Sequence, residues 1–157
     1  PTGSNLSQGA LEIRDFKHLK DMILFVCKMS REQLLLTNLT RFYQHPDHAN
    51  TLQSLLQKKE GISLRNIEWF VTNHSKKKRT TYTTHDGRSF TVHMSYKSSL
   101  DGYSKKLFDP FCRTDRIDFD EHNTTVAQLN FIKWCIENDI IDYIKKNKVE
   151  LFSKKTT

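Results

Sequence analysis

The sequence has few of the residues on which small secreted domains and membrane proteins depend. Of its 157 residues only three are cysteines, Cys27, Cys112 and Cys135, and they are far apart and outside any C-x-x-C spacing. This pattern argues against a disulfide framework and against a cysteine-rich zinc site. No apolar run approaches the roughly 18 residues of a membrane span, and no secretory signal is found. We therefore expect a protein of the cytosol, or of a particle assembled there, without a membrane partner.

Familiar catalytic motifs are also missing. The sequence contains no G-x-x-x-x-G-K-[ST], G-x-G-x-x-G, H-E-x-x-H or G-x-S-x-G. Two weaker arrangements remain: the His45 and His48 pair, which would need further metal ligands from elsewhere, and the acidic residues 109–121, which could hold Mg²⁺. Neither has a partner motif, so no cofactor is predicted and a non-catalytic protein is favoured.

The residues that are present predict a globular protein. Apolar residues make up 36% and charged residues 27% of the chain, and there are 10 Phe, 5 Tyr and 2 Trp. Chains of this length and composition can bury a hydrophobic core without disulfide bonds or bound metal ions. Residues 1–4 look like a cloning remnant, residues 5–150 are expected to form one domain, and residues 151–157 are expected to be a flexible tail, with polar fraying from Lys145 onward.

The excess positive charge is concentrated in one third of the chain. The net charge is +7, and residues 62–107 hold nine Lys or Arg against three Asp or Glu, whereas the rest holds 16 against 15. Such a local excess predicts a surface that attracts a polyanion. The alternative is a lysine-rich surface that only keeps the protein soluble.

The N-terminal half has the periodicity of helices. Apolar residues three and four apart predict one helix over residues 10–29 and a second, capped by Ser30, that ends before Pro46. A third helix is expected to be capped by Asp47 and a fourth by Ser63.

Beyond residue 79 the periodicity becomes that of strands. Residues 80–84 and 89–96 are rich in β-branched and aromatic residues and flank an Asp86-Gly87 turn, which predicts a hairpin. The alternation of Phe90, Val92, Met94 and Tyr96 extends the second strand through residue 96.

The remaining elements complete the predicted fold. We expect a short helix over residues 98–108, a long acidic loop over residues 109–123, and a C-terminal helix capped by Thr125 and interrupted near Asn138. The predicted class is a mainly helical α+β fold with four N-terminal helices, a central β-hairpin and a C-terminal helix.

The fourth helix and the hairpin form the most suggestive unit. A helix that runs into a basic stretch and then a hairpin resembles the way in which winged-helix domains meet DNA. The residues expected to contact phosphates are Arg65, Lys76, Lys77, Lys78, Arg79, Arg88, Lys97, Lys105 and Lys106. Tyr82 and Tyr103 are the aromatic residues best placed to stack on bases. The alternative is that Lys76–Arg79 is a solvated turn favoured by the helix dipole.

Three stretches of the chain carry a resemblance to a known group of proteins. Ser63–Lys77, Tyr96–Arg113 and Thr124–Trp134 resemble segments of uncharacterised proteins from nucleocytoplasmic large DNA viruses, including mimivirus-like ones. The resemblance covers roughly residues 60–145. It implies a viral setting, in a cytoplasmic viral factory of the host or in the virion, and it carries over no activity and no functional residue.

Together these features predict a non-catalytic nucleic-acid-binding protein. DNA and RNA stay open as the ligand. One alternative is a module that docks an acidic viral or host protein through the same surface, including as a virion component. A second is a metal-dependent nucleic-acid enzyme that uses the acidic residues 109–121.

Overall fold

A computed structural model describes residues 31–58, 61–111, 113 and 115–152 of the chain. The chain divides into two compact units, Pro1–Leu34 and Leu35–Thr157, and the second unit holds the features discussed below. The helix predicted over residues 10–29 and the cap Ser30 lie outside the described residues. Of the helices that are described, none is long and apolar enough to cross a membrane.

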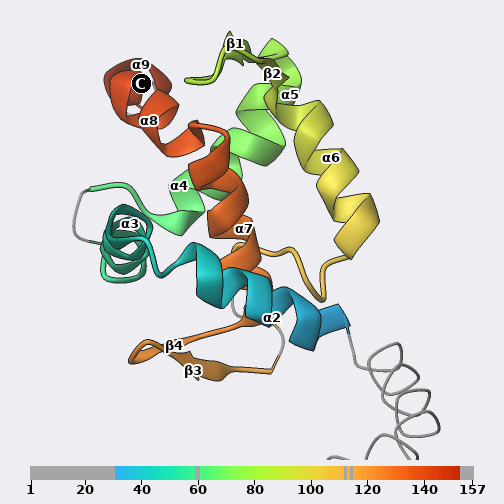
Figure 1. Cartoon of the computed structure of the whole chain (residues 1–157). Helices are drawn as coiled ribbons and strands as arrows, with labels where there is room; N and C mark the ends of the chain where they lie inside the picture. Colours follow the sequence, from blue (N-terminus) through green and yellow to red (C-terminus); the bar gives the residue numbers. More distant parts are fainter. Residues whose placement is uncertain (1–30, 59–60, 112, 114, 153–157) are drawn as a thin grey trace, which may run out of the picture. The chain divides into compact units, whose positions relative to one another are not determined.

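Helices dominate the described chain, and two short hairpins interrupt them (Figure 1). The first group comprises α2 (Arg31–Phe42), α3 (Pro46–Leu56), α4 (Leu64–Trp69), the π-helix η1 (Phe70–His74) and α5 (Ser75–Lys78). There follow the strands β1 (Thr81–Thr83) and β2 (Ser89–Thr91), α6 (Val92–Tyr103), the strands β3 (Ile117–Phe119) and β4 (His122–Thr124), α7 (Val126–Glu137), α8 (Ile140–Lys146) and α9 (Lys148–Phe152). Each hairpin is an antiparallel two-stranded sheet. The predicted class, a mainly helical α+β fold, is confirmed.

Polar side chains start two helices where the sequence predicts them. Ser63 Oγ accepts the backbone N–H of Asn66 at 3.1 Å, and Asn66 Oδ1 accepts the backbone N–H of Ser63, which makes a reciprocal capping box at α4. Thr125 Oγ1 accepts the backbone N–H of Gln128 at 3.0 Å and caps α7. Both predicted caps are confirmed.

The predicted cap of the third helix is wrong. Helix α3 begins at Pro46, and the ring Nδ1 of His45 accepts the backbone N–H of Asp47 at 3.2 Å. Because proline has no N–H to satisfy and has its φ already set, it fits the first turn of a helix. Asp47 is therefore inside the helix that it was expected to cap.

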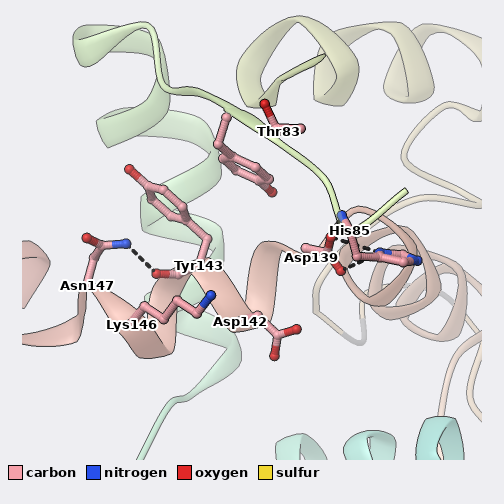
Figure 2. A pocket seen from close by; sticks show the side chains of 8 residues that line it. Thr83, His85, Asp139, Asp142, Tyr143, Lys146 and Asn147 are labelled. Atoms are coloured by element: carbon pink, nitrogen blue, oxygen red, sulfur yellow. Dashed lines mark hydrogen bonds and ion pairs between the residues drawn. The ribbon is translucent and has the colours of Figure 1, made fainter. Parts of the chain in front are cut away.

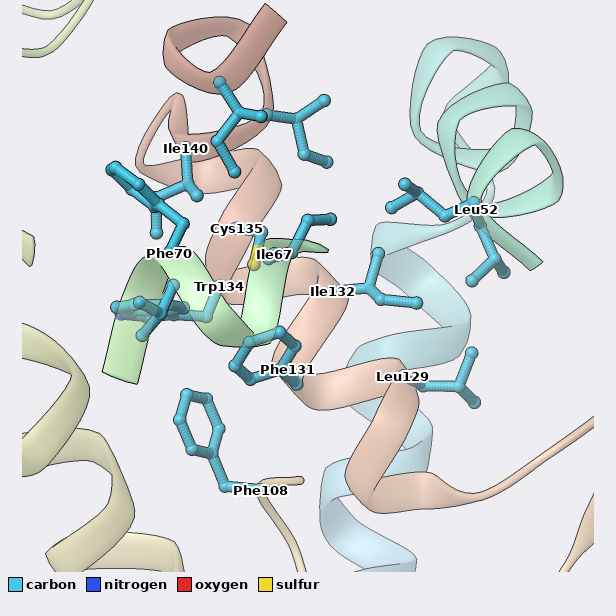
Figure 3. Packing of buried hydrophobic residues seen from close by; sticks show 14 of the residues in the cluster. Leu52, Ile67, Phe70, Phe108, Leu129, Phe131, Ile132, Trp134, Cys135 and Ile140 are labelled. Atoms are coloured by element: carbon cyan, nitrogen blue, oxygen red, sulfur yellow. The ribbon is translucent and has the colours of Figure 1, made fainter. Parts of the chain in front are cut away.

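Helix α7 lies at the centre of the core (Figure 3). It is buried around most of its circumference, as expected for a helix that neighbours cover on several sides. Side chains from the other helices pack around it, among them Leu52, Ile67, Phe70 and Ile140. The short helices are thus positioned by their contact with α7 and its neighbours.

The second strand of the central hairpin is shorter than predicted. Gly87 has a φ of 87° in the turn, as the Asp86-Gly87 pair requires, but β2 ends at Thr91 and residues 92–103 form α6. Met94, expected on the core face of a strand, is 71% exposed. The helical spacing of Val92, Tyr96 and Leu100 places these side chains against the core instead. The helix predicted over residues 98–108 therefore starts earlier and ends at Tyr103.

The expected acidic loop contains a hairpin. Strands β3 and β4 pair across a turn in which Asp120 and Glu121 have φ values of 51° and 69°. Two consecutive residues with positive φ match the twist of a tight hairpin, but this turn normally uses Asn and Gly, so the sequence carries little sign of it.

The chain end is more ordered than expected within the described residues. Helix α8 continues through Lys146, α9 spans Lys148–Phe152, and Leu151 is buried. The polar fraying predicted from Lys145 onward is wrong as far as residue 152, because Leu151 and Phe152 join the core. Residues 153–157 lie outside the described residues.

Candidate nucleic-acid interface

Helices α5 and α6 bring two lysines of the basic segment to the same histidine. The two helices pack against each other, at the upper right of Figure 1. His93 has a pKa below its usual value because burial disfavours its charged form and because the charges of Lys76 and Lys97 oppose another positive charge. Lysines that are far apart in the sequence therefore act on one ring. We call Lys76, Lys77, His93 and Lys97 the α5–α6 surface.

The lysines of the α5–α6 surface lack acidic partners. Lys76, Lys77 and Lys97 are exposed, and none of them takes part in an ion pair with any residue that the structure describes. Their charge is therefore not neutralised within this part of the molecule. An exposed, uncompensated cluster of this kind attracts anions from solution.

Lys78 and Arg79 occupy the end of the same helix but line a different space. Both are exposed, and they line a cleft of about 610 Å³ between the end of α5, the start of β1 and α9. Positions 76 and 78 differ by about 200° around a helix, so their side chains leave α5 on opposite sides. The basic stretch expected to act as one unit thus divides between two surfaces.

Three more predicted phosphate contacts lie away from the α5–α6 surface. Arg65 is exposed at the start of α4 and lines a separate cleft of about 900 Å³ with Arg116 and Glu121. Lys105 and Lys106 follow the end of α6, which at 1.5 Å per residue is about 18 Å from its start. All three are exposed. Lys97 lies halfway along α6, so a ligand that follows the second half of this helix, about 9 Å, would reach Lys105 and Lys106 together with Lys97.

Arg88 is held by neighbouring side chains at the tip of the β1–β2 hairpin. Its Nε donates to Asp86 Oδ2 at 2.8 Å, and a terminal nitrogen donates to Asn138 Oδ1 at 3.4 Å. Hydrogen bonds from Thr84 and Arg88 lower the pKa of the Asp86 carboxyl to about 2. Arg88 is therefore neutralised locally, in contrast to the lysines of α5 and α6.

A second pair anchors the same hairpin to the junction between α7 and α8 (Figure 2). The Asp139 carboxylate accepts the backbone N–H of His85 at 2.6 Å and lies 2.9 Å from His85 Nδ1. The hydrogen bond and the negative charge of Asp139 raise the pKa of His85. Asp139 has a φ of 59° between the two helices. The hairpin tip is thus fixed by charged contacts that the sequence alone does not reveal.

The tyrosines expected to stack on bases are already packed against other rings. Tyr82 stacks on Tyr143 with ring centroids 4.7 Å apart, and its hydroxyl donates to the backbone oxygen of Asn138 at 2.5 Å. Burial raises the pKa of Tyr82 well above its ordinary value. Tyr103 stacks on Phe108 at 6.2 Å. Both rings therefore pack within the folded structure and contribute to its aromatic contacts.

Trp69 is a candidate functional residue that the sequence analysis missed. It is half-buried and lines the cleft that holds Lys78 and Arg79. The π-helix η1 adds a residue to the turn, so His74, five positions further along the chain, lies near Trp69 with ring centroids 5.5 Å apart. A regular α-helical spacing does not predict this grouping, and the sequence has no clear signal for the π-helix.

Of the residues considered for metal binding, His45 and His48 lie close together, with ring centroids 4.6 Å apart, but no described Cys, Asp or Glu completes a group of three with them. His48 stacks on Phe42 at 3.9 Å while His45 caps α3. Asp109 is buried with its Oδ2 3.3 Å from Arg113 Nε, whereas Asp118 and Asp120 are exposed on the β3–β4 hairpin. Among the described residues, no three His, Cys, Asp or Glu side chains gather closely enough to hold a metal ion.

Comparisons with known proteins agree with the resemblance found in the sequence. A curated relative, "Uncharacterized protein L507" of Acanthamoeba polyphaga mimivirus, is 37% identical over 126 residues. These cover 72% of the chain and 49% of the relative, so the chain spans about half the length of that protein. No solved structure matches. The predicted likeness to uncharacterised proteins of giant viruses is confirmed. The model of a family of unknown function, DUF7197, matches residues 16–157, and the chain belongs to that family.

Proposed function

We propose that this protein binds nucleic acid without catalysis and that it contacts phosphates through the α5–α6 surface. The observation that carries the proposal is the set of exposed lysines on two packed helices, Lys76, Lys77 and Lys97, without an ion-pair partner among the described residues. Phosphates would neutralise these charges and release counterions. Lys105 and Lys106 would extend the contact along a longer strand.

The finer form of the proposal is a winged-helix-like use of α5 and the β1–β2 hairpin. The order of helix, basic stretch and hairpin supports it. The contacts of Arg88 with Asp86 and Asn138 count against a role for the hairpin tip. We therefore assign the main phosphate contacts to the two helices and expect Arg88 to contribute less.

A second use of the same surface is docking of an acidic viral or host protein. The uncompensated lysines support either partner, because both present rows of negative charge. A location in the viral factory or the virion is compatible with either partner, and the mimivirus relative supports the viral setting of this proposal.

Binding measurements at several salt concentrations test the proposal. Fluorescence anisotropy with labelled single- and double-stranded DNA and RNA should show an affinity that falls steeply with salt. The double variant Lys76→Gln/Lys97→Gln should flatten the log–log salt slope by about 1.4 to 1.8, because each phosphate that a lysine neutralises adds about 0.7 to 0.9 to that slope.

The matched control removes the same amount of charge elsewhere. Lys133→Gln/Lys146→Gln changes one lysine on α7, which pairs with Glu137 at 3.7 Å, and one on α8. We expect its salt slope to stay near that of the unmodified protein. Equal slopes for both double variants would mean that only net charge matters and would overturn the assignment of the α5–α6 surface.

A further inference from the structure

The cleft beside the end of α5 combines aromatic and charged lining residues. Its volume is about 610 Å³, and Trp69, His74, Lys78, Arg79 and Glu150 are among its lining residues. Pockets for small molecules typically have volumes of about 300 to 1,000 Å³, with an apolar wall and a few polar groups. The cleft combines an indole ring with two cations and one carboxylate, so it offers both an aromatic surface and groups that can orient a charged ligand.

Arg79 has a backbone conformation that normally favours glycine. Its φ and ψ are 52° and 48°, in the left-handed region, and this bend directs the chain from α5 into β1. Glycine would make the bend without strain. This conformation is common where a helix ends, and the Arg79 N–H bonds back to the Ser75 carbonyl, so the bend places the Arg79 side chain beside the cleft.

Lys78 gives the cleft a second cation. Neither Lys78 nor Arg79 forms an ion pair with another described residue, although Glu150 lines the same cleft. Two cations at one end of a cleft can bind a phosphate together, and guanidinium groups do so with two parallel hydrogen bonds.

Glu150 restricts the class of ligand. A carboxylate repels a bare phosphate but accepts hydrogen bonds from the amino and imino groups on the edge of a base. Trp69 lies 5.5 Å from the His74 ring and 5.7 Å from the Phe152 ring, both tilted, and its indole forms the aromatic part of the cleft wall against which a base can pack. A ligand that satisfies all of these groups has a phosphate at one end and an aromatic ring with N–H donors at the other.

We propose that this cleft binds a nucleoside phosphate, with the base against Trp69 and the phosphate on Lys78 and Arg79. The inference rests on the proposed function. Within the basic region it assigns the cleft to one nucleotide, which is either free or an unpaired nucleotide of a single strand. The same chemistry occurs in a mononucleotide and in an unpaired nucleotide of a strand. Guanosine monophosphate is the best probe, because its base presents two adjacent N–H donors to Glu150.

Tryptophan fluorescence reports directly on this cleft. The protein has two tryptophans; Trp134 is 7% exposed, and its Nε1 donates to Ser95 Oγ at 3.0 Å. Guanosine monophosphate should quench the emission in a saturable way, and Trp69→Phe should abolish that quenching while the Trp134 emission still reports a folded core. Parallel titration of N-acetyltryptophanamide corrects for absorption by the nucleotide.

Variants and ligand fragments locate the contacts. Lys78→Gln/Arg79→Gln should raise the Kd for guanosine monophosphate about tenfold or more, since it removes two charge-assisted contacts. Lys97→Gln, on the α5–α6 surface, should leave this Kd unchanged. Guanosine alone and inorganic phosphate alone should not saturate over the same concentration range.

The outcomes separate the cleft from the proposed function. Saturable quenching of Trp69 by guanosine monophosphate supports a free-nucleotide site, and quenching by a single-stranded oligonucleotide alone supports a site for an unpaired nucleotide in a strand. If neither quenches Trp69 while oligonucleotides still bind in the anisotropy assay, the cleft proposal is overturned and the proposed function stands. If guanosine monophosphate quenches but no oligonucleotide binds, the proposed function fails and the cleft is retained.

Discussion

The α5–α6 surface and the tip of the β1–β2 hairpin contain the same kinds of residue, and they use them differently. Each has a histidine and exposed cationic side chains from the basic segment. At the tip, Arg88 and His85 contact the carboxylates of Asp86 and Asp139. On the α5–α6 surface, Lys76 and Lys97 have no such partner among the described residues. The carboxylates at the tip neutralise its cations locally, whereas the charge of the α5–α6 surface stays uncompensated among the described residues.

The comparison shows why the number of charges does not locate a binding surface. Residues 62–107 are distinguished by their excess of Lys and Arg, and that excess includes both regions. An exposed ion pair contributes little to stability, but it neutralises a charge that would otherwise attract an anion. The presence or absence of a carboxylate partner therefore distinguishes the two regions, which the number of charges does not.

The largest effect on nucleic-acid affinity is expected when the lysines of the α5–α6 surface are given a carboxylate partner, like the one that Arg88 has at the hairpin tip. His93→Glu places a carboxylate between Lys76 and Lys97, where it would occupy both ammonium groups and repel phosphates. We expect nucleic-acid affinity to fall on the order of a hundredfold at low salt, because the two lysines no longer neutralise phosphates and a repulsive charge is added. His93→Gln is the control, and in anisotropy titrations near neutral pH it should bind almost as tightly as the unmodified protein.

A loss of affinity in His93→Gln as large as in His93→Glu would contradict this explanation. The ring itself, and not the state of the two lysines, would then be the group that matters.

The tip should respond through stability and not through binding. Tyr82 donates its hydroxyl to the backbone oxygen of Asn138 beneath the tip, and Tyr82→Phe leaves that oxygen without its partner. We expect the free energy of unfolding to fall by about 1 kcal/mol, the usual net value of one hydrogen bond. Urea denaturation measures it. Tyr96→Phe is the control, since the Tyr96 hydroxyl makes no hydrogen bond in the described part of the chain, and it should change stability much less.

Releasing the paired arginine should produce a smaller gain in binding. Asp86→Asn removes the carboxylate that accepts from Arg88 Nε at 2.8 Å and leaves a neutral side chain of the same shape. If pairing is what separates the tip from the α5–α6 surface, affinity for duplex DNA should rise about two- to fivefold and the salt slope should steepen by less than the value for one phosphate, about 0.9. An affinity unchanged at low salt would show that the tip does not approach the ligand, and the winged-helix-like form would be dropped.

Local signals in the sequence predicted the parts of the fold that depend on a few neighbouring residues. The caps at Ser63 and Thr125 and the turn at Asp86-Gly87 each depend on contacts within three residues. The interruption near Asn138 is also confirmed, because α7 ends at Glu137 and Asn138 follows it as the C-cap. The strand predicted through Tyr96 was wrong because apolar residues at alternate positions also satisfy a helical spacing of four.

The candidate site was less predictable because its geometry depends on pairs that are distant in the sequence. His85 and Asp139 are 54 residues apart, and Lys76 and Lys97 meet only because α5 packs on α6. His74 lies near Trp69 because of the π-helix, which has no clear sequence signal. Composition located the basic third of the chain, but only the fold separates its surfaces.

The last comparison is between the two histidines, and it concerns stability as a function of pH. Asp139 raises the pKa of His85, so the folded protein holds that proton more tightly than the unfolded chain. Its contribution to stability is complete below the unfolded-state pKa of about 6.5 and disappears as the pH rises through the higher folded-state value.

His93 should act in the opposite direction. Burial and the charges of Lys76 and Lys97 lower its pKa, so the unfolded chain holds that proton more tightly. Its contribution to stability is present above a pH of about 6.5 and disappears as the pH falls through the lower folded-state value. One variant at His85 and one at His93 therefore compare the hairpin tip with the α5–α6 surface through the same type of side chain.

Urea denaturation of the two single variants, from about pH 5 to about pH 8.5, measures both effects. Relative to the unmodified protein, His85→Gln should lose stability mainly at the acidic end, because its pairing with Asp139 is then missing. His93→Gln should gain stability at the acidic end, because no half-buried ring then has to be protonated near two lysines. These effects are expected to be the smallest of the set, since both rings are partly exposed. Parallel curves for the two variants would show that the carboxylate at the tip and the lysines of the α5–α6 surface do not act on these rings as the geometry indicates.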